Sequence, residues 1–184
     1  MEIRDAINSR RTIRIYKTKP VDDKTLETVL DAGRLAPSWG NSQTWRWVIV
    51  RDEKTRLAIA EQAPRVGNRS TQALKTAPVI IVACAELNNA GVRDGQPLTD
   101  KGGYWYMFDA ALALENMVLT AHSLGLGTVF VGGMDAKKVE TIINVPSGYA
   151  VVILMVLGYP DEQPEARPRK ELSELVFHEK FGNK

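Results

Sequence analysis

Apolar residues gather in four short runs and one long run, separated by polar stretches that contain glycine and proline. Residues 79–85 and 150–157 are apolar at almost every position, which is typical of strands covered on both faces of a sheet. Residues 45–50 and 127–131 are rich in β-branched and aromatic side chains, which favour strands. The pattern therefore predicts four strands that share one core.

The long run, residues 104–124, is apolar on almost every face and spans roughly 31 Å if it is helical. A helix that is apolar all round is either buried or crosses a membrane. Its polar residues are too frequent for a membrane span: Asp109, Glu115, Asn116, Thr120 and His122. We therefore expect a central helix that is buried in the core or covered in part by a second copy of the chain.

Shorter segments predict further helices around this core. They cover residues 2–9, a segment that begins at Asp22 and ends before Pro37, and residues 53–63, 136–144 and 171–181. Together with the strands, they predict an α+β fold in which a sheet lies between two helical layers, a three-layer α/β/α sandwich. We expect a single domain over residues 1–184.

Residues 86–103 contain Asn, Gly, Asp and Pro throughout and show no periodicity. A loop of about 18 residues inside a compact domain is usually either functional or disordered. We expect this loop to be the lid of a substrate site.

Composition and charge exclude several classes of protein. A net charge of +2 gives no field strong enough to indicate a nucleic-acid partner. The single Cys84 excludes an internal disulfide and a cysteine-based zinc site. The N-terminal residues are charged and lack the apolar segment of a signal peptide, so we expect a cytoplasmic protein without a membrane anchor.

The residues that usually carry catalysis are scarce. Neither of the two histidines lies near a serine or cysteine signature of a hydrolytic triad. No metal-binding spacing and no P-loop phosphate motif occurs. Gly125 and Gly127 follow a helix and precede a strand, the wrong order for a dinucleotide-binding turn, so we interpret Gly125 as a helix cap. We assign no catalytic side chain and no metal ligand.

A phosphate site is one interpretation of the segment that follows the first helix. Arg10, Arg11 and Arg14 offer forked donors suited to a phosphate, and the hydroxyl of Thr12 lies between them. A solvated basic turn at the end of a helix explains the same residues equally well. A second basic group around Arg169, taken alone, indicates a solvated tail.

Two further segments offer the groups that a planar heterocycle needs. The loop of residues 37–43 combines hydrogen-bonding groups with one flat ring: Ser38, Trp39, Asn41 and Gln43. A surface turn whose Trp packs on the core is the alternative. Gly132 and Gly133, at the end of a strand, let a ligand reach the backbone, and a plain turn explains them equally well. Phosphate donors, a ring-binding loop and no acid–base set together indicate that a cofactor carries the chemistry.

Four motifs in this order resemble those of the FMN-dependent nitroreductase family, and together they span nearly the whole chain. Residues 10–14 (RRTIR) resemble its flavin-phosphate motif, and residues 36–43 (APSWGNSQ) resemble its APS-x-x-N-x-Q loop. Residues 125–133 are similar to its GLGT…GG segment, and residues 158–160 followed by Arg169 are similar to its LGYP…RK ending. The resemblance implies a mixed sheet of four to five strands and an obligate homodimer with two FMN sites at its interface.

The resemblance also implies roles for individual residues. The phosphate and ribityl groups of FMN would be held by one set: Arg10, Arg11, Thr12, Arg14 and Arg169. The flavin would be reached from the other subunit by a second set: Pro37, Ser38, Trp39, Asn41 and Gln43. Val131, Gly132 and Gly133 would lie close to the flavin, with the two glycines near its hydride-accepting nitrogen.

The implied activity is that of an FMN-dependent oxidoreductase that takes hydride from NADH or NADPH. It would pass the electrons to a small molecule: a nitroaromatic, a quinone or a related acceptor. Two alternatives stay open: a reductive dehalogenase or flavin-fragmenting enzyme of the same fold, and a protein that binds FMN without turnover. A nucleic-acid-binding module is a poor alternative, because aromatic residues are not interleaved with the basic clusters as in an RNA-binding signature.

Overall fold

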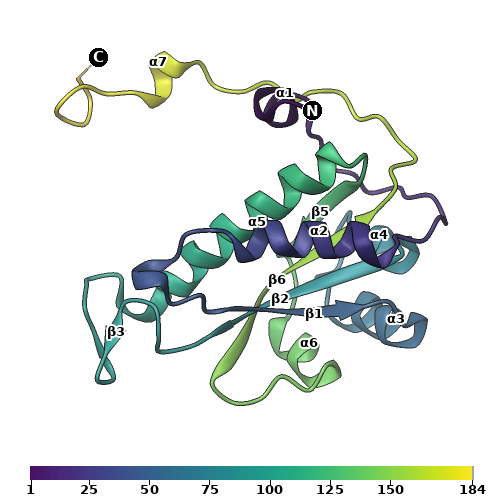
Figure 1. The fold of residues 1–184 in the computed structure, drawn as a ribbon, viewed down its shortest axis with the longest axis horizontal. Helices are drawn as coiled ribbons and strands as arrows, with labels where there is room; N and C mark the ends of the chain where they lie inside the picture. The colour runs from purple at the N-terminus through teal and green to yellow at the C-terminus, as the bar shows by residue number, and fades with distance from the viewer. Residues whose placement is uncertain (184) are drawn as a thin grey trace.

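The computed structural model describes residues 1–183, and its main feature is a four-stranded sheet (Figure 1). The strand order is β1 (Trp45–Val50), β2 (Val79–Glu86), β6 (Tyr149–Gly158) and β5 (Gly127–Val131). Each strand lies within one residue of its predicted bounds, and every neighbouring pair is antiparallel. A parallel bridge between Thr12 and Thr128 adds the N-terminal stretch to the β5 edge, so the mixed character of the sheet rests on this pairing.

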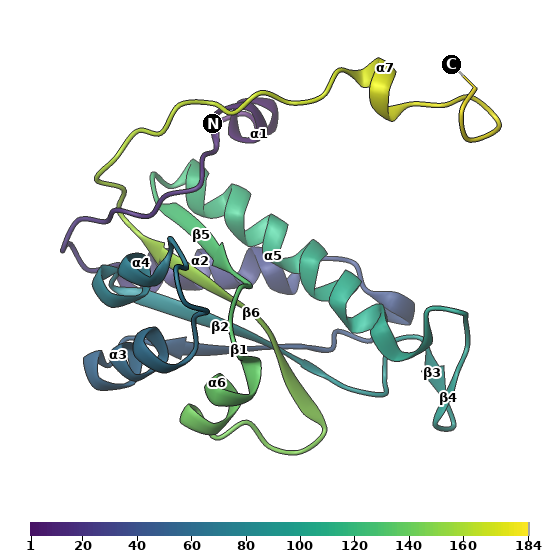
Figure 2. The same cartoon turned by 180° about the vertical axis from the view of Figure 1, so that it is seen from behind.

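Helices cover both faces of the sheet, which confirms the three-layer sandwich (Figures 1 and 2). The first layer holds α2 (Asp23–Arg34) and α5 (Trp105–Ser123), and the second holds α3 (Glu53–Gln62), α4 (Thr71–Thr76) and α6 (Ala136–Ile142). In β2, Ile81 points to the first layer and Ile80 to the second. Because successive side chains of a strand alternate between faces, a strand covered on both sides is apolar throughout.

Helix α5 is buried on most of its surface and exposed along one stripe. Where it crosses α2, Met117 lies so close to Gly33 that a Cβ on this glycine would be 2.7 Å from the Met117 Sδ. By contrast, Tyr104 at its N-cap is 72% exposed and Phe108 is 55% exposed. The core of the chain therefore buries most of this helix. Cover of its exposed stripe by a second copy of the chain stays a prediction. No helix within residues 1–183 is long and apolar enough to cross a membrane, and the cytoplasmic location stays a prediction.

The segment between β2 and α5 is structured, although its sequence has no periodicity. It contains a short hairpin, β3 (Val92–Arg93) with β4 (Gln96–Pro97), and a 3-10 turn, η2 (Gly102–Tyr104). Trp105 anchors the hairpin, because its indole N–H donates to Thr99 Oγ1 at 2.8 Å and its ring packs directly on the Gly91 backbone. The role of this segment as a substrate lid stays a prediction.

The predicted helix over residues 171–181 is wrong. Only one turn, α7 (Leu172–Leu175), is helical, in a C-terminal segment that passes α1 (Ile3–Ser9) and extends away from the sheet (Figures 1 and 2). Short helices depend on packing of an apolar face. Phe181 is 93% exposed, so within this chain the segment has no core on which a longer helix can pack.

Replacing Met117 by Ala tests the contact between α2 and α5. Met117 is completely buried, so the truncation leaves a cavity, and the free energy of unfolding should fall by about 2–5 kcal/mol. Urea denaturation measures this change. The control, Lys54→Ala on the exposed side of α3, should change it by less than about 0.5 kcal/mol. Similar values for the two variants would contradict the packing described.

Candidate functional site

The basic segment after α1 runs along the edge strand β5. Ile13 donates its backbone N–H to the carbonyl of Thr128 at 2.9 Å, and its side chain is buried against Gly127. A Cβ on Gly127 would lie 2.6 Å from Cγ1 of Ile13, so only glycine allows this approach. With Ile13 pointing inward, Arg10 and Thr12 line a cavity of about 230 Å³ with residues of β5 and α5.

Two acceptors, the Glu162 carboxylate and the Ile13 carbonyl, hold the part of this segment that follows Ile13. The carboxylate of Glu162 accepts the backbone N–H groups of Arg14 and Ile15, the latter at 3.0 Å. The Tyr16 hydroxyl donates to the Ile13 carbonyl at 2.6 Å, and burial, helped by the negative charge of Glu162, raises the pKa of Tyr16 far above its usual value. The backbone that carries Thr12 and Arg14 is therefore held in a defined extended conformation.

The structure does not bring Arg11 to the same side as its neighbours. Its guanidinium donates to the backbone carbonyls of Asn8 and Arg10, both at 2.8 Å. It lines a separate cavity of about 440 Å³ together with His122. The phosphate role of Arg11 stays a prediction that this arrangement does not support.

The contact of His122 with Ser9 is not a catalytic dyad. His122 Nε2 lies 2.8 Å from the Ser9 Oγ, but the Ser9 hydroxyl donates its hydrogen to the Asp5 carbonyl at 2.6 Å. Nε2 must therefore be the donor, and the imidazole cannot act as a base toward this hydroxyl. Burial and the charges of Arg10 and Arg11 lower the pKa of His122.

The glycine pair at the end of β5 is joined to the same edge. Val131 is buried in the core, whereas Gly132 and Gly133 are exposed. The Gly133 carbonyl accepts from the Arg65 backbone N–H and from Asn68 Nδ2, both at 2.9 Å. These bonds place the glycines beside residues 65–70, a segment that the sequence identified only as a polar loop.

Asn68 and Ser70 were not predicted as site residues. Asn68 Oδ1 accepts from the Ser70 backbone N–H at 2.9 Å, and the buried Ser70 Oγ accepts from Arg14 Nε at 3.4 Å. The two residues thus connect the glycine pair to the basic segment. We refer to the resulting set as the β5-edge cluster: Arg10, Thr12, Arg14, Gly132 and Gly133.

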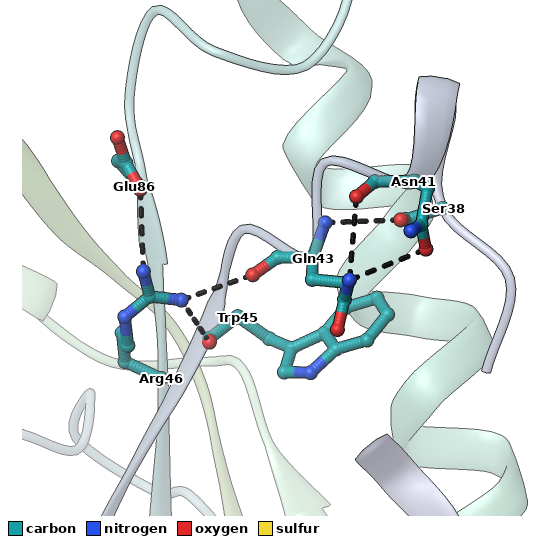
Figure 3. Close-up of polar contacts among 6 residues, drawn as sticks. All are labelled: Ser38, Asn41, Gln43, Trp45, Arg46 and Glu86. Atoms are coloured by element: carbon teal, nitrogen blue, oxygen red, sulfur yellow. Dashed lines mark hydrogen bonds and ion pairs between the residues drawn. The ribbon is translucent and has the colours of Figure 1, made fainter. Parts of the chain in front are cut away.

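The loop of residues 37–43 forms a second, separate cluster around a short 3-10 turn, η1 (Trp39–Asn41), and we call it the η1 loop. Its groups bond mainly to one another (Figure 3): the Gln43 backbone N–H donates to Ser38 Oγ at 3.0 Å, and Gln43 Nε2 donates to Asn41 Oδ1 at 3.3 Å. Arg46 adds a bond from Nη1 to the Gln43 carbonyl at 2.9 Å. Asn41 and Gln43 are exposed, and their amides are available to a ligand.

The two clusters contact different parts of α5. Val118 lines the cavity that contains Arg10 and Thr12, whereas Asp109 bonds to the η1 loop. The nine positions from Asp109 to Val118 correspond to roughly 13 Å along the helix axis. In one chain, therefore, the clusters lie at separate places along α5. Arg169 lies in the C-terminal segment and forms no hydrogen bond within the described part of the chain.

The described residues contain neither a cluster of metal-ligating side chains nor an exposed thiol. Within residues 1–183, no group of three His, Cys, Asp or Glu side chains could hold a metal ion. Cys84 is buried in the core, and burial raises the pKa of its thiol to about 11, which keeps it protonated and unreactive.

Comparisons with known proteins point to one family. Residues 7–159 match the Nitroreductase family. A NADH dehydrogenase of Thermus thermophilus is 30% identical over 201 residues and covers 96% of each chain. A 5,6-dimethylbenzimidazole synthase of Rhodospirillum rubrum is 30% identical over 186 residues, which cover 90% of this chain and 84% of that protein. The solved NADPH:FMN oxidoreductase of Vibrio harveyi, complexed with NAD+, is 26% identical and superposes with a TM-score of 0.82, covering 99% of this chain and 79% of the other.

These matches define the class of the protein as a flavin oxidoreductase. The chain belongs to the Nitroreductase family, as the match over residues 7–159 shows. Relatives of similar identity carry different activities in their names, so family membership alone does not select a substrate.

Replacing Glu162 by Ala should loosen the basic segment. The variant removes the acceptor of two backbone N–H groups, and each bond to a charged group is worth about 1.5–3 kcal/mol. Hydrogen exchange of the Arg14 and Ile15 amides should therefore accelerate by about tenfold or more, as measured by NMR. Glu165→Ala, an exposed neighbour in the same segment, is the control. Unchanged exchange at Arg14 and Ile15 in the Glu162 variant would contradict the role of this carboxylate.

Proposed function

We propose that this protein is an FMN-dependent oxidoreductase that takes hydride from NADH or NADPH and reduces a nitroaromatic, a quinone or a related electron acceptor. One observation carries the proposal. The chain has two clusters suited to the two ends of FMN, and they lie at separate places along α5. We therefore propose a homodimer in which each flavin lies between the β5-edge cluster of one subunit and the η1 loop of the other.

The β5-edge cluster has the donors that a phosphate monoester requires. Arg10 and Thr12 share one cavity, and Arg14 lies next to it along the same extended backbone. Guanidinium groups bind phosphate through paired, charge-assisted hydrogen bonds. Arg169 would join them from the C-terminal segment. Gly132 and Gly133 would present their backbone to the flavin ring, while the buried Val131 would contribute only through its backbone.

The η1 loop has groups that match the polar edge of a flavin ring. The ring edge offers both N–H donors and carbonyl acceptors, and the amides of Asn41 and Gln43 can pair with either kind. Ser38 holds the loop by accepting from Gln43, and Pro37 and Trp39 supply apolar surface. When bound, FMN supplies the hydride chemistry, and the protein binds, orients and shields it.

Exposed apolar surface supports the proposed dimer. Tyr104, Met107 and Phe108 form an uncovered patch at the N-terminal end of α5. Leu172, Val176 and Phe181 are exposed in the C-terminal segment, which leaves the body of its own chain (Figure 1). Uncovered apolar surface of this kind is typical of protein–protein interfaces.

The cofactor and the activity are tested together. Heating the purified protein should release FMN and not FAD. Anaerobic stopped-flow mixing with NADH or NADPH should bleach the bound flavin rapidly, and a nitroaromatic or quinone should restore its colour. A protein that binds FMN without turnover would stay coloured after mixing. Release of FAD, or failure to bind added FMN, would contradict the cofactor assignment.

The shared site is tested by complementation between two defective subunits. Arg14→Glu should repel the phosphate, and Asn41→Asp should place a negative charge at the ring edge, so each homodimer should be nearly inactive. In a mixed dimer, one site receives both defects and the other receives neither. Purified heterodimers should therefore regain about half of the wild-type FMN content and turnover, provided that the two sites act independently.

Two outcomes separate the shared site from a site within one chain. Recovery in the heterodimer requires that the two residues serve the same flavin from different subunits. A heterodimer as inactive as its parents would mean that each flavin is bound within one chain, or that one defect disrupts both sites.

A further inference from the structure

Asp109 stands out in α5 as a buried acidic residue. It is 1% exposed and is the only charged side chain that is fully buried within residues 1–183. Its neighbours on the buried side of the helix are apolar, among them Ala110, Ala113 and Leu114. An apolar residue would be the ordinary choice at such a position.

The helix itself does not explain this choice. Asp is a weak helix former. Asp109 is the fifth residue of α5, beyond the first turn in which the helix dipole favours acidic side chains. In the described part of the chain, Asp109 also has no ion-pair partner. A buried carboxylate without a cation is unfavourable relative to an apolar side chain, so other contacts must account for it.

The η1 loop provides those contacts. Asp109 Oδ1 accepts from the backbone N–H of Trp39 at 2.9 Å, and Oδ2 accepts from the Ser42 hydroxyl at 3.1 Å. Hydrogen bonds to an ionised acceptor are roughly twice as strong as neutral ones. Both oxygens of one carboxylate are thus committed to the loop that we propose to face the flavin.

The loop needs such an external anchor because its backbone is strained. Gly40, Asn41 and Gln43 have φ angles of 51°, 57° and 46°, all in the left-handed region. This conformation is easy for glycine and unfavourable for other residues. This conformation points Ser42 inward to Asp109 and leaves Asn41 and Gln43 exposed, where a ligand can reach them. A loop without the anchor would relax and lose this alternation.

An aromatic contact fixes the same part of the loop from the same helix. The Trp39 and Trp105 rings lie 4.6 Å apart with an interplanar angle of 41°, and Phe108 meets Trp105 edge-on at 5.7 Å. Since the N–H of Trp39 is one of the two donors to Asp109, the carboxylate sets where its indole meets Trp105. The geometry of this ring pair therefore reports on the anchor.

We propose that Asp109 is a positioning residue that holds the η1 loop in its binding conformation before the cofactor arrives. It touches no cofactor itself and acts through Trp39 and Ser42. The inference rests on the proposed function, because it assumes that the η1 loop faces the flavin ring. It adds a residue that neither the motif of the loop nor its immediate neighbours in the sequence identify.

Two substitutions at one position separate positioning from a general structural role. Asp109→Ala removes both acceptors. Asp109→Asn keeps one oxygen for the Trp39 N–H, and its amide nitrogen can donate to the Ser42 Oγ, so it should restore the loop. Asn116→Ala is the control, because Asn116 lies on the same helix and bonds to the Ala32 carbonyl, away from the loop.

The affinities for FMN and riboflavin give the first readout. Asp109→Ala should weaken both ligands by about tenfold or more, and by the same factor, because the η1 loop is expected to meet the ring that they share. Asp109→Asn and Asn116→Ala should stay within about threefold of the wild type. Arg10→Ala, for comparison, should weaken FMN alone. Unchanged affinities in Asp109→Ala, or an equal loss in Asp109→Asn, would overturn the proposal.

The near-ultraviolet circular dichroism of the cofactor-free protein gives a second readout. Asp109→Ala should remove the part of the Trp signal that Trp39→Phe also removes, and Asp109→Asn should keep it. An unaltered spectrum in Asp109→Ala would overturn the proposal. If the wild type binds neither FMN nor riboflavin, the proposed function fails, and the spectra still decide the role of Asp109.

Discussion

The structure depends on covering α5, a 19-residue helix with apolar side chains around most of its circumference. Such a helix must be covered on nearly every side. Helix α2 and the sheet cover much of it, and Gly33 lets α2 come close to Met117. The basic segment and β5 contact α5 near Val118, and the η1 loop contacts it near Asp109. The remaining apolar stripe around Phe108 is exposed in the single chain.

Two carboxylates, those of Glu162 and Asp109, hold the two clusters in place. In our proposal neither of them contacts the cofactor. Glu162 receives two backbone N–H groups of the basic segment, and Asp109 receives one from the η1 loop together with a hydroxyl. Both segments are irregular and lack partners within a helix or an inner strand. A carboxylate is a strong acceptor for such isolated N–H groups. The conformations of both clusters are therefore set by residues outside the binding motifs.

The sequence predicted the parts of the fold that local patterns determine. The apolar runs gave all four strands and the central helix, because strands covered on both faces and buried helices have distinctive compositions. The predicted helix over residues 171–181 failed because its pattern has no core to pack against in the same chain. The alternation that separates Arg11 from Arg10 and Thr12 was not predicted either, since it depends on the bridge to Thr128.

The candidate site was predicted where the motifs are continuous and missed where the contacts are distant. The η1 loop and the glycine pair were identified from short segments. The bond from Trp39 to Asp109 spans 70 residues, and that from Arg14 to Glu162 spans 148. Single-sequence patterns do not reach across such separations. Asn68 offered only a weak signal, as an Asn two residues before a Ser that precedes a helix.

The central claim is that a complete flavin site requires two chains, and sedimentation velocity recorded at the visible absorbance of the flavin tests it most directly. If the site is shared in this way, all bound flavin should sediment with a species of twice the mass of the chain. Dilution below the dissociation constant of the dimer should then release the flavin together with the monomers. Flavin that sediments with the monomer, at an affinity equal to that of the dimer, would contradict the account.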